Sequence, residues 1–434
     1  MTALWKQETR LHPTFDKLNR CLEADWFLLP FELRLQKAHA RALESAVILS
    51  HAERESLDGA LADIEASFVN QPCPTSDAED LHTWIEGELV KRTGDAGKKI
   101  HTARSRNDQV ATLIRLFVID AGRRMAGKMK SLVETACRRA IAWSEVPMPM
   151  QTHQQFAAPG NVGFWAMRYA ATLERVRRHW CGVVDVWQRE CPLGSGAVAG
   201  SSIPIDRNLT AALLGFEGPS LNALDSTSTR DECLEFLFLA SQTALHLQSL
   251  ATDVIVFSQT PLAWTKYPAE FGTGSSMMPN KMNPDAMELL RGEANALLAA
   301  HVHAMLLMKG LPSGYNRDLQ CIKPIVRDAA KKLDDLIELA AAFLEQLEFD
   351  RERLAEAMRQ GAIEATLRME QLVKEGKPLR DAHHAVSDEV AKGTVVLAGE
   401  PEDWSSRYAT TGSAKPEETR RVAEALLHTL TESE

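Results

Sequence analysis

The run RDECLEFLFLASQTALHLQSLATDVIVFSQT, residues 230–260, contains neither glycine nor proline. Its apolar residues recur at intervals of three and four, the period of one face of an α-helix, at Leu234, Leu237, Ala240, Ala244, Leu247, Ala251 and Val254. Further apolar residues lie off that face, at Phe236, Leu239, Leu245, Leu250 and Ile255. Most of the helix circumference is therefore apolar, which is typical of a helix buried among other helices.

Other stretches predict long helices around this one, at residues 105–126, 163–190, 284 to about 309, and 324–360. Pro284 with Asp285 behind it makes a favourable first helical turn. Helices of about thirty residues are ~45 Å long, too long for a compact monomeric globule. The apolar circumference of residues 230–260 indicates that some partner helices come from other subunits. Alternation of the β type is scarce, so the predicted fold is all-α.

The chain divides by pattern into three predicted domains. Residues 1–103 hold short amphipathic helices and end in the turn-rich TGDAGKKIHTA. Residues 104–356 hold the long helices, and residues 357–434 hold shorter segments broken by glycines. No internal repeat or low-complexity tract interrupts these three parts.

Composition excludes several classes of protein. The 434 residues carry a net charge of −10, which gives no electrostatic footprint for nucleic acid or an anionic membrane. The seven cysteines are scattered without a C-x-x-C pair, which fits neither a disulfide framework nor a zinc site. The N-terminus lacks the apolar core of a signal peptide, and His301, His303 and Lys309 interrupt the longest apolar stretch. We expect a reduced, intracellular chain.

Two stretches combine polar side chains with helix-start or loop signals. In HTARSRNDQVAT, residues 101–112, Ser105 and Asn107 suit the start of a helix because an apolar run follows. With Arg106 beside them, that N-terminus would suit a carboxylate; a plain helix cap is the alternative. In MPMQTHQQFAAPG, residues 148–160, His153 lies beside Thr152 in a loop between prolines. A lone histidine there is more often structural than catalytic.

The stretch FGTGSSMMPNKMNP, residues 271–284, places a serine and a lysine six apart on a glycine-rich loop. Glycine permits backbone angles that expose N–H groups near Ser275. Those groups and the Lys281 ammonium could stabilise a serine oxyanion, and the loop could close over a ligand. The alternative is a connector between helices. A fourth stretch, SGYNRDLQCIK at residues 313–323, carries polar residues that alone would indicate a surface loop.

Together these stretches resemble the fumarase/aspartase superfamily, and within it the argininosuccinate lyase family. GSSMMPNKMNP, residues 274–284, matches the superfamily signature G-S-S-x-M-P-x-K-x-N-P at every fixed position. Further stretches resemble that family in order along nearly the whole chain: SRNDQVAT, PLGSGAVAG, IDR, LLGFEG, RDECLEFL, KGLPSGYNRDLQ and GKPLRDAHH.

The resemblance implies a reaction and an architecture. The reaction is the reversible anti β-elimination of fumarate from an N-substituted aspartate without a cofactor. The family's version converts argininosuccinate to arginine and fumarate in cytoplasmic arginine biosynthesis. The architecture is a three-domain fold with a long central helical bundle, in a homotetramer whose core has twenty helices. Each active site is then shared between three subunits, and the partner expected for each is a small-molecule substrate.

The resemblance also implies residue roles. Ser275 would remove the Cβ proton, and Lys281 and Asn283 would hold the resulting aci-carboxylate. His153 would serve the departing nitrogen as the acid, or orient that acid. The positions that bind the substrate are matched by Ser105, Arg106, Asn107, Thr152, Tyr315, Gln320, Lys323, Arg230 and His82.

The chain departs from the family pattern at several places. LWKQET replaces the usual LWGGRF near the N-terminus, and Cys21 stands where a serine precedes Asp25. Further changed positions are Gln151 for tyrosine, Ala103 for glycine, and Leu113 and Leu367 for aspartate. Residues for the fumarate half are intact, whereas several changes fall where the amine would bind. Three interpretations stay open: an argininosuccinate lyase, a lyase of the same mechanism for another amine, and a non-catalytic relative.

Overall fold

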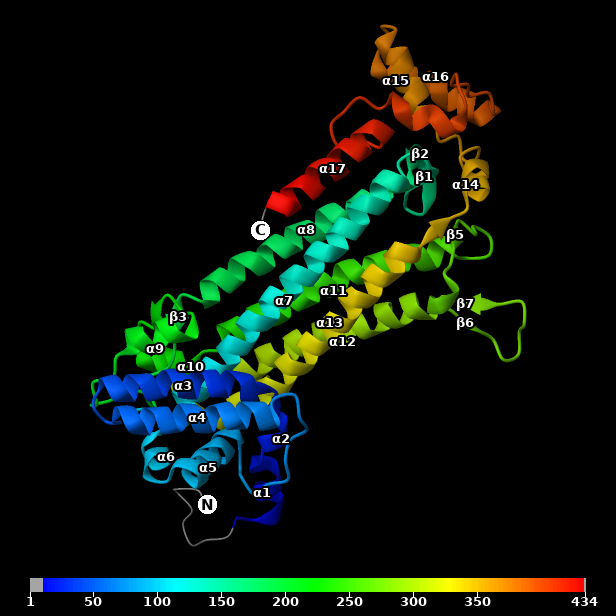
Figure 1. The fold of residues 1–434 in the computed structure, drawn as a ribbon. Coiled ribbons are helices and arrows are strands. Elements are labelled where there is room, and N and C mark those ends of the chain that lie inside the picture. The colour runs from blue at the N-terminus through cyan, green and yellow to red at the C-terminus, as the bar shows by residue number, and fades with distance from the viewer. Residues whose placement is uncertain (1–10, 433–434) are drawn as a thin grey trace. The chain divides into compact units, whose positions relative to one another are not determined.

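The computed structural model describes residues 11–432, so the LWKQET departure lies outside the described residues. Helices dominate the fold, as the sequence predicts (Figure 1). Five of them are long: α7 (Arg106–Ala142), α8 (Val162–Trp187), α11 (Asp231–Phe257), α12 (Asp285–Met308) and α13 (Ile322–Gln346). The strands of the described part are short and pair only two by two.

One helix is shorter than predicted, because α13 ends at Gln346 and not at residue 360. The chain then forms β8 (Glu348–Phe349), which pairs antiparallel with β5 (Thr265–Lys266). Phe349 is buried there, with its ring centroid 5.1 Å from that of Trp143. A new helix, α14 (Arg351–Ala357), starts behind the side-chain cap of Asp350. The helix thus ends at Gln346 although no glycine or proline follows there. It ends because the chain turns into a strand pair in which the Phe349 ring is buried.

The chain forms two compact units, and each long helix contributes to both. Unit 1 comprises Met1–Arg124, His179–Ser241 and Leu297–Lys332. Unit 2 comprises Met125–Arg178, Gln242–Ala296 and Leu333–Glu434. Each unit therefore draws on more than one of the three segments expected from the sequence, and that three-domain division stays a prediction.

Unit 1 is built from short helices around the first part of α7. They are α1 (Pro13–Asn19), α2 (Leu22–Asp25), α3 (Leu29–Ser45), α4 (His51–Phe68), α5 (Leu81–Thr93), α6 (Asp95–Lys99), α9 (Arg207–Leu214) and α10 (Ala223–Ser228). The 3-10 helices η1 (Trp26–Leu28) and η3 (Arg317–Cys321) and the parallel pair of β3 (Glu190–Cys191) with β4 (Gly218–Pro219) complete it. The partly buried rings of Trp26 and Phe68 meet the buried ring of Trp84 edge to face.

A glycine sets the distance between α7 and α8 within unit 1. A Cβ added at Gly122 would lie 2.7 Å from a Val184 methyl carbon and 3.1 Å from the Trp187 ring. Real Cβ contacts are longer, so only glycine allows the two helices to approach this closely. α7 also continues to Ala142, well beyond the predicted end near residue 126.

Unit 2 holds a hairpin and the C-terminal helices. β1 (Pro147–Thr152) pairs antiparallel with β2 (Gln155–Asn161), and β6 (Thr273–Gly274) with β7 (Met282–Asn283). The remaining elements are η2 (Ala269–Phe271), α15 (Ala365–Lys374), α16 (Leu379–Lys392), η4 (Pro401–Arg407) and α17 (Pro416–Glu432). Leu367 packs there in a cluster with Met358, Ile363, Leu397 and Trp404. An apolar side chain at position 367 therefore suits its surroundings.

Two global features bear on the class of protein. Between residues 11 and 432, no helix combines the length and apolar character needed to cross a membrane. All seven cysteines have free thiols.

Candidate active site

A cavity of about 400 Å³ in unit 1 gathers seven of the nine side chains that the sequence indicates for substrate binding. The ends of elements build it. The first turn of α5, the start of α7, η3 and the first turn of α13 each contribute. The seven are His82, Ser105, Arg106, Asn107, Tyr315, Gln320 and Lys323. Residues from three separate stretches of the sequence therefore line one space.

The start of α7 is both a capped helix end and a wall of the cavity. Ser105 Oγ accepts from the backbone N–H of Asn107 at 3.3 Å, and the Asp108 carboxylate accepts from the backbone N–H of Ser105 at 2.9 Å. The other Asp108 oxygen accepts from the N–H groups of Gly194 and Gly196, at 3.0 and 2.7 Å. Burial raises the pKa of Asp108 to about 6. The capping interpretation of this motif is therefore confirmed, while carboxylate binding at this helix start stays a prediction.

Arg106 is held in place by the neighbouring helix start. Its Nη1 donates to Asp80 at 2.9 Å and its Nη2 to the Thr83 hydroxyl at 2.8 Å. Asp80 in turn caps α5 by accepting from the Thr83 N–H at 2.7 Å. Burial opposes ionisation of Asp80, but His82 and Arg106 hold its pKa below the usual value. The guanidinium is consequently fixed at the cavity wall by a carboxylate that stays charged.

Asp25 is a buried member of this site that the sequence reasoning did not assign. Its carboxylate accepts from Lys323 Nζ at 2.8 Å and from Gln320 Nε2 at 3.3 Å. The Cys21 thiol also donates to it at 3.3 Å. Burial, followed by the charge of Asp25, raises the pKa of the Cys21 thiol to about 12. Asp25 therefore orients two cavity side chains, and Cys21 touches it as a neutral thiol.

His101 also lines the cavity, although no sequence pattern indicates it beyond its place before the SRND motif. Burial, followed by the charges of Arg104 and Arg106, lowers the pKa of His101 to about 4. Its ring is therefore uncharged at neutral pH.

Two of the expected binding residues lie elsewhere. Arg230 is fully buried just before α11 and does not line the cavity. Thr152 is exposed at the end of β1, in unit 2.

The structure places His153 at the turn of the β1–β2 hairpin. The strands pair Thr152 with Gln155, so only His153 and Gln154 form the turn. Both have positive φ, 53° and 59°, the backbone region that a tight two-residue hairpin turn requires. Side chains other than glycine and asparagine adopt it at a cost of about 1–3 kcal/mol, and such strain concentrates at functional sites. The exposed His153 imidazole is thus presented by a strained turn.

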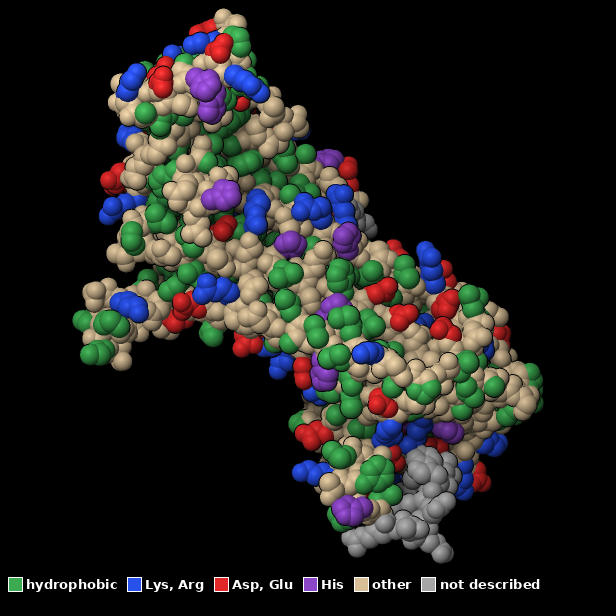
Figure 2. Space-filling view, turned by 180° about the vertical axis from the view of Figure 1, so that it is seen from behind, with side chains coloured by type: hydrophobic (Ala, Val, Ile, Leu, Met, Phe, Trp, Pro, Cys, Tyr) green, Lys and Arg blue, Asp and Glu red, His purple; other side chains and the backbone are tan. Residues whose placement is uncertain are grey.

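Ser275 stands at the end of the short strand β6, on the loop that the signature predicts. Its Oγ accepts from the N–H groups of Met277 at 3.3 Å and Met278 at 3.0 Å. Backbone donors are therefore present at Ser275, and their role toward a serine oxyanion stays a prediction. Lys281 is exposed, and Asn283 lies on β7, paired with Thr273. The loop projects at the left edge of Figure 2 with green apolar side chains at its tip.

Comparisons of this chain with known proteins indicate one family. The family described as Lyase matches residues 14–298. An argininosuccinate lyase of Acidobacterium capsulatum is 37% identical over 402 residues, which cover 90% of this chain and 82% of that relative. This chain belongs to the argininosuccinate lyase family. It is accordingly a carbon–nitrogen lyase of the fumarase/aspartase superfamily.

Solved structures agree on the fold of this lyase. A variant of EDDS lyase with bound fumarate matches with a TM-score of 0.81 at 20% identity, covering 98% of this chain and 91% of that chain. A class II fumarase from Schistosoma mansoni matches with a TM-score of 0.71 at 16% identity, covering 88% and 90%. At these identities the likeness concerns the fold alone.

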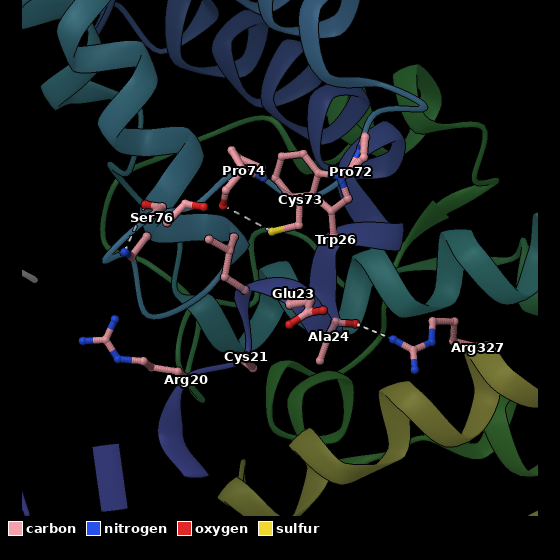
Figure 3. Close-up of a pocket in the computed structure, with 13 residues that line it drawn as sticks. Arg20, Cys21, Glu23, Ala24, Trp26, Pro72, Cys73, Pro74, Ser76 and Arg327 are labelled. Carbon is pink, nitrogen blue, oxygen red and sulfur yellow. Dashed lines mark hydrogen bonds between the residues drawn. The ribbon is translucent and has the colours of Figure 1, made fainter. Parts of the chain in front are cut away.

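The lyase has a second, larger cavity in unit 1, of about 960 Å³ (Figure 3). Arg20, Cys73 and Arg327 lie on its walls. Their polar contacts go to the protein itself: Cys73 Sγ to the Pro74 carbonyl at 3.7 Å, and Arg327 Nη1 to the Ala24 carbonyl at 3.4 Å. None of the residues assigned to catalysis or substrate binding lines it. The smaller cavity is therefore the candidate site despite its size.

Three family departures acquire a structural description. Ala103 has φ of 63°, which confirms that alanine occupies a backbone conformation suited to glycine. Leu113 is fully buried, so an apolar side chain suits its position on α7. Gln151 is partly exposed on β1, two residues before His153.

Proposed function

We propose that this lyase cleaves argininosuccinate into arginine and fumarate by reversible anti β-elimination. The observation that carries the proposal is the unit 1 cavity, which joins a helix N-terminus and Arg106 to Tyr315, Gln320 and Lys323. A substrate with several carboxylates needs this combination of fixed cations and hydrogen-bond donors. The 37% identical argininosuccinate lyase supports the choice of substrate.

In this proposal Ser275 is the base that removes the Cβ proton. Two backbone N–H groups already point at its oxygen, which favours the alkoxide over the hydroxyl. Lys281 and Asn283 hold the aci-carboxylate, where negative charge develops as the proton leaves. Loss of the amine from the neighbouring carbon then gives fumarate. The loop acts as a lid that brings the base to the substrate.

His153 serves the leaving nitrogen in the same scheme, as the acid or as the residue that orients it. Its position supports this role, because the turn exposes the imidazole in a strained backbone conformation, and such strain concentrates at functional sites. Thr152 contributes a hydroxyl beside it, for a substrate carboxylate.

We further propose a homotetramer in which three subunits contribute to each site. Apolar side chains are exposed on the long helices, at Phe238 and Leu245 of α11 and at Leu289, Val302, Met305 and Leu306 of α12. Met277 and Met278 are exposed beside Ser275. Contiguous exposed apolar surface typically marks a protein interface. The free cysteines support a reducing, cytoplasmic location.

A second candidate is the same elimination with a different leaving amine. Cys21 favours it, because a neutral thiol replaces the family's serine hydroxyl beside Asp25. A thiol is a weaker hydrogen-bond donor and acceptor than a hydroxyl, so the environment of Asp25, which holds Gln320 and Lys323 of the cavity, has changed.

One experiment separates the two candidates. The purified protein is given argininosuccinate, and fumarate and arginine are measured together. Release of both at ~1 per second or faster supports the first proposal. Without release, fumarate is offered with a panel of amines, and formation of an N-substituted aspartate supports the second. A lack of reaction in both directions would contradict both proposals.

A further inference from the structure

A buried carboxylate lies behind the unit 1 cavity, at Glu32 on α3. It has no exposed surface, and three side chains form hydrogen bonds with it. They are Gln36 Nε2 at 2.6 Å, Gln109 Nε2 at 2.5 Å and His82 Nδ1 at 3.2 Å. Burial of a charge is costly unless it is paired and hydrogen-bonded. Three helices, α3, α5 and α7, therefore converge on this one group.

The ionisation state of Glu32 determines which histidine nitrogen carries a proton. Burial alone would raise the pKa of Glu32, but the His82 ring, Arg104 and Gln36 bring it below the ordinary value. An ionised carboxylate only accepts hydrogen bonds, so His82 Nδ1 must be the protonated donor. The partner of one ring nitrogen thus fixes the tautomer and the direction of the other.

The other nitrogen, Nε2, belongs to a ring that lines the substrate cavity. His82 is only 4% exposed, and within residues 11–432 its Nε2 has no hydrogen-bond partner. An unpaired polar atom in a buried position costs about 1–3 kcal/mol. That cost is recovered when a ligand in the cavity supplies the missing partner.

We propose that Glu32 is a positioning residue, which holds His82 so that Nδ1–H faces the protein and Nε2 faces the substrate. The inference rests on the proposed function of the cavity. It assigns a role to the carboxylate behind the histidine that lines this cavity. Glu32 itself acts through His82 and does not touch the substrate. Neighbouring cations of the cavity are already directed at protein carboxylates, Arg106 at Asp80 and Lys323 at Asp25. His82 instead keeps one polar atom for the ligand.

The activity test uses Glu32→Gln, His82→Gln and the double variant. Glutamine keeps the size of Glu32. Its carbonyl can accept from Gln36 and Gln109 Nε2, as Glu32 Oε1 does, which turns its amide N–H toward His82 Nδ1 and removes the acceptor there. We expect Glu32→Gln to lower kcat/KM roughly 10–100-fold. This is the range found when the hydrogen-bond partner of a metal-binding histidine is replaced. The double variant should lose no more than His82→Gln alone, because both changes remove one function.

Glu174→Gln is the matched control, because Glu174 is also buried but pairs with Arg177 and Arg178 in unit 2. A merely structural role for Glu32 would give losses that multiply in the double variant, or an effect of Glu32→Gln no larger than that of the control. Either result would overturn the proposal.

A second readout does not depend on catalysis. Protein labelled with 15N-histidine is examined by NMR without substrate, and His82→Gln identifies the His82 signals. The expected result is a protonated Nδ1 in the wild type and a changed tautomer balance in Glu32→Gln. A wild-type ring protonated at Nε2 and bare at Nδ1 would overturn the proposal. If the wild type releases no fumarate, the proposed function fails, while this measurement still decides the role of Glu32.

Discussion

At the scale of single residues, the family departure at Ala103 has a cost in folding free energy. Its φ of 63° lies in the left-handed region, where a Cβ costs about 1–2 kcal/mol. Glycine removes that cost. It also increases the conformational entropy of the unfolded chain, which lowers the stability gained by about 0.4–1 kcal/mol. We therefore expect Ala103→Gly to raise the free energy of unfolding by up to about 1 kcal/mol, measured by urea denaturation.

An alanine-to-glycine substitution should have the opposite effect on the free energy of unfolding at an exposed helical position. Ala62 is exposed within α4, where glycine is less favourable than alanine by about 1 kcal/mol. Ala62→Gly should therefore lower the free energy of unfolding. Equal effects at the two positions would contradict the strain at Ala103.

His101 makes a prediction about pH. Its pKa is about 4 in the folded protein, where burial and then Arg104 and Arg106 lower it, and about 6.5 in the unfolded chain. The unfolded chain therefore binds the extra proton as the pH falls below 6.5, and stability decreases until about pH 4. His101→Gln should reduce the loss of unfolding free energy between pH 7 and pH 5. Asp108 titrates in the same window with the opposite sign in both proteins, so the difference between them isolates His101.

An unchanged loss of stability in His101→Gln would refute this assignment. Urea denaturation at both pH values gives the comparison.

The sequence predicted most residues of the unit 1 cavity, because they lie in motifs that local patterns and the resemblance single out. Asp25 and Glu32 were missed for a physical reason. Asp25 pairs with Lys323, 298 positions away, and Glu32 pairs with His82, 50 positions away. The role of such a buried carboxylate depends on a partner that only folding brings close, so no local sequence pattern indicates it.

At the scale of elements, α7 contains a matched pair of glycines. Gly122 faces Val184 and Trp187 of α8, whereas a Cβ at Gly127 would meet nothing within 4 Å. Gly127→Ala should stabilise the helix by up to about 1 kcal/mol. Gly122→Ala should come out about 1–3 kcal/mol less stable than Gly127→Ala, the usual cost of overpacking. Thermal and urea unfolding of the two variants test this, and equal stabilities would mean that α7 and α8 do not pack closely.

Periodicity located the long helices well but not all their ends. The starts of α7, α8, α11, α12 and α13 fall within two residues of the predicted ones. The end of α13 was wrong because Phe349 is buried in a strand pair, a tertiary effect. The β1–β2 hairpin was not predicted because its turn is His153–Gln154, and not the Asn-Gly or Asp-Gly that usually marks such turns.

At the scale of the whole molecule, the proposed tetramer depends on apolar side chains of α12. Leu306 is 64% exposed there, and Leu221 is 92% exposed just before α10. A buried unpaired charge in an interface is strongly unfavourable, so Leu306→Glu should shift the protein to smaller species. Leu221→Glu should not, because Leu221 lies on none of the long helices. Light scattering after size-exclusion chromatography reads the mass, and a monomeric wild type would contradict the tetramer.

The central claim is that Ser275 carries the elimination. The most direct measurement is fumarate release from argininosuccinate, followed by ultraviolet absorbance, in the wild type and Ser275→Ala side by side. Circular dichroism confirms that both are equally helical. The account predicts a loss of roughly 10²–10⁴-fold or more in the variant, the contribution of a positioned general base. Fumarate release by Ser275→Ala at the wild-type rate would contradict it.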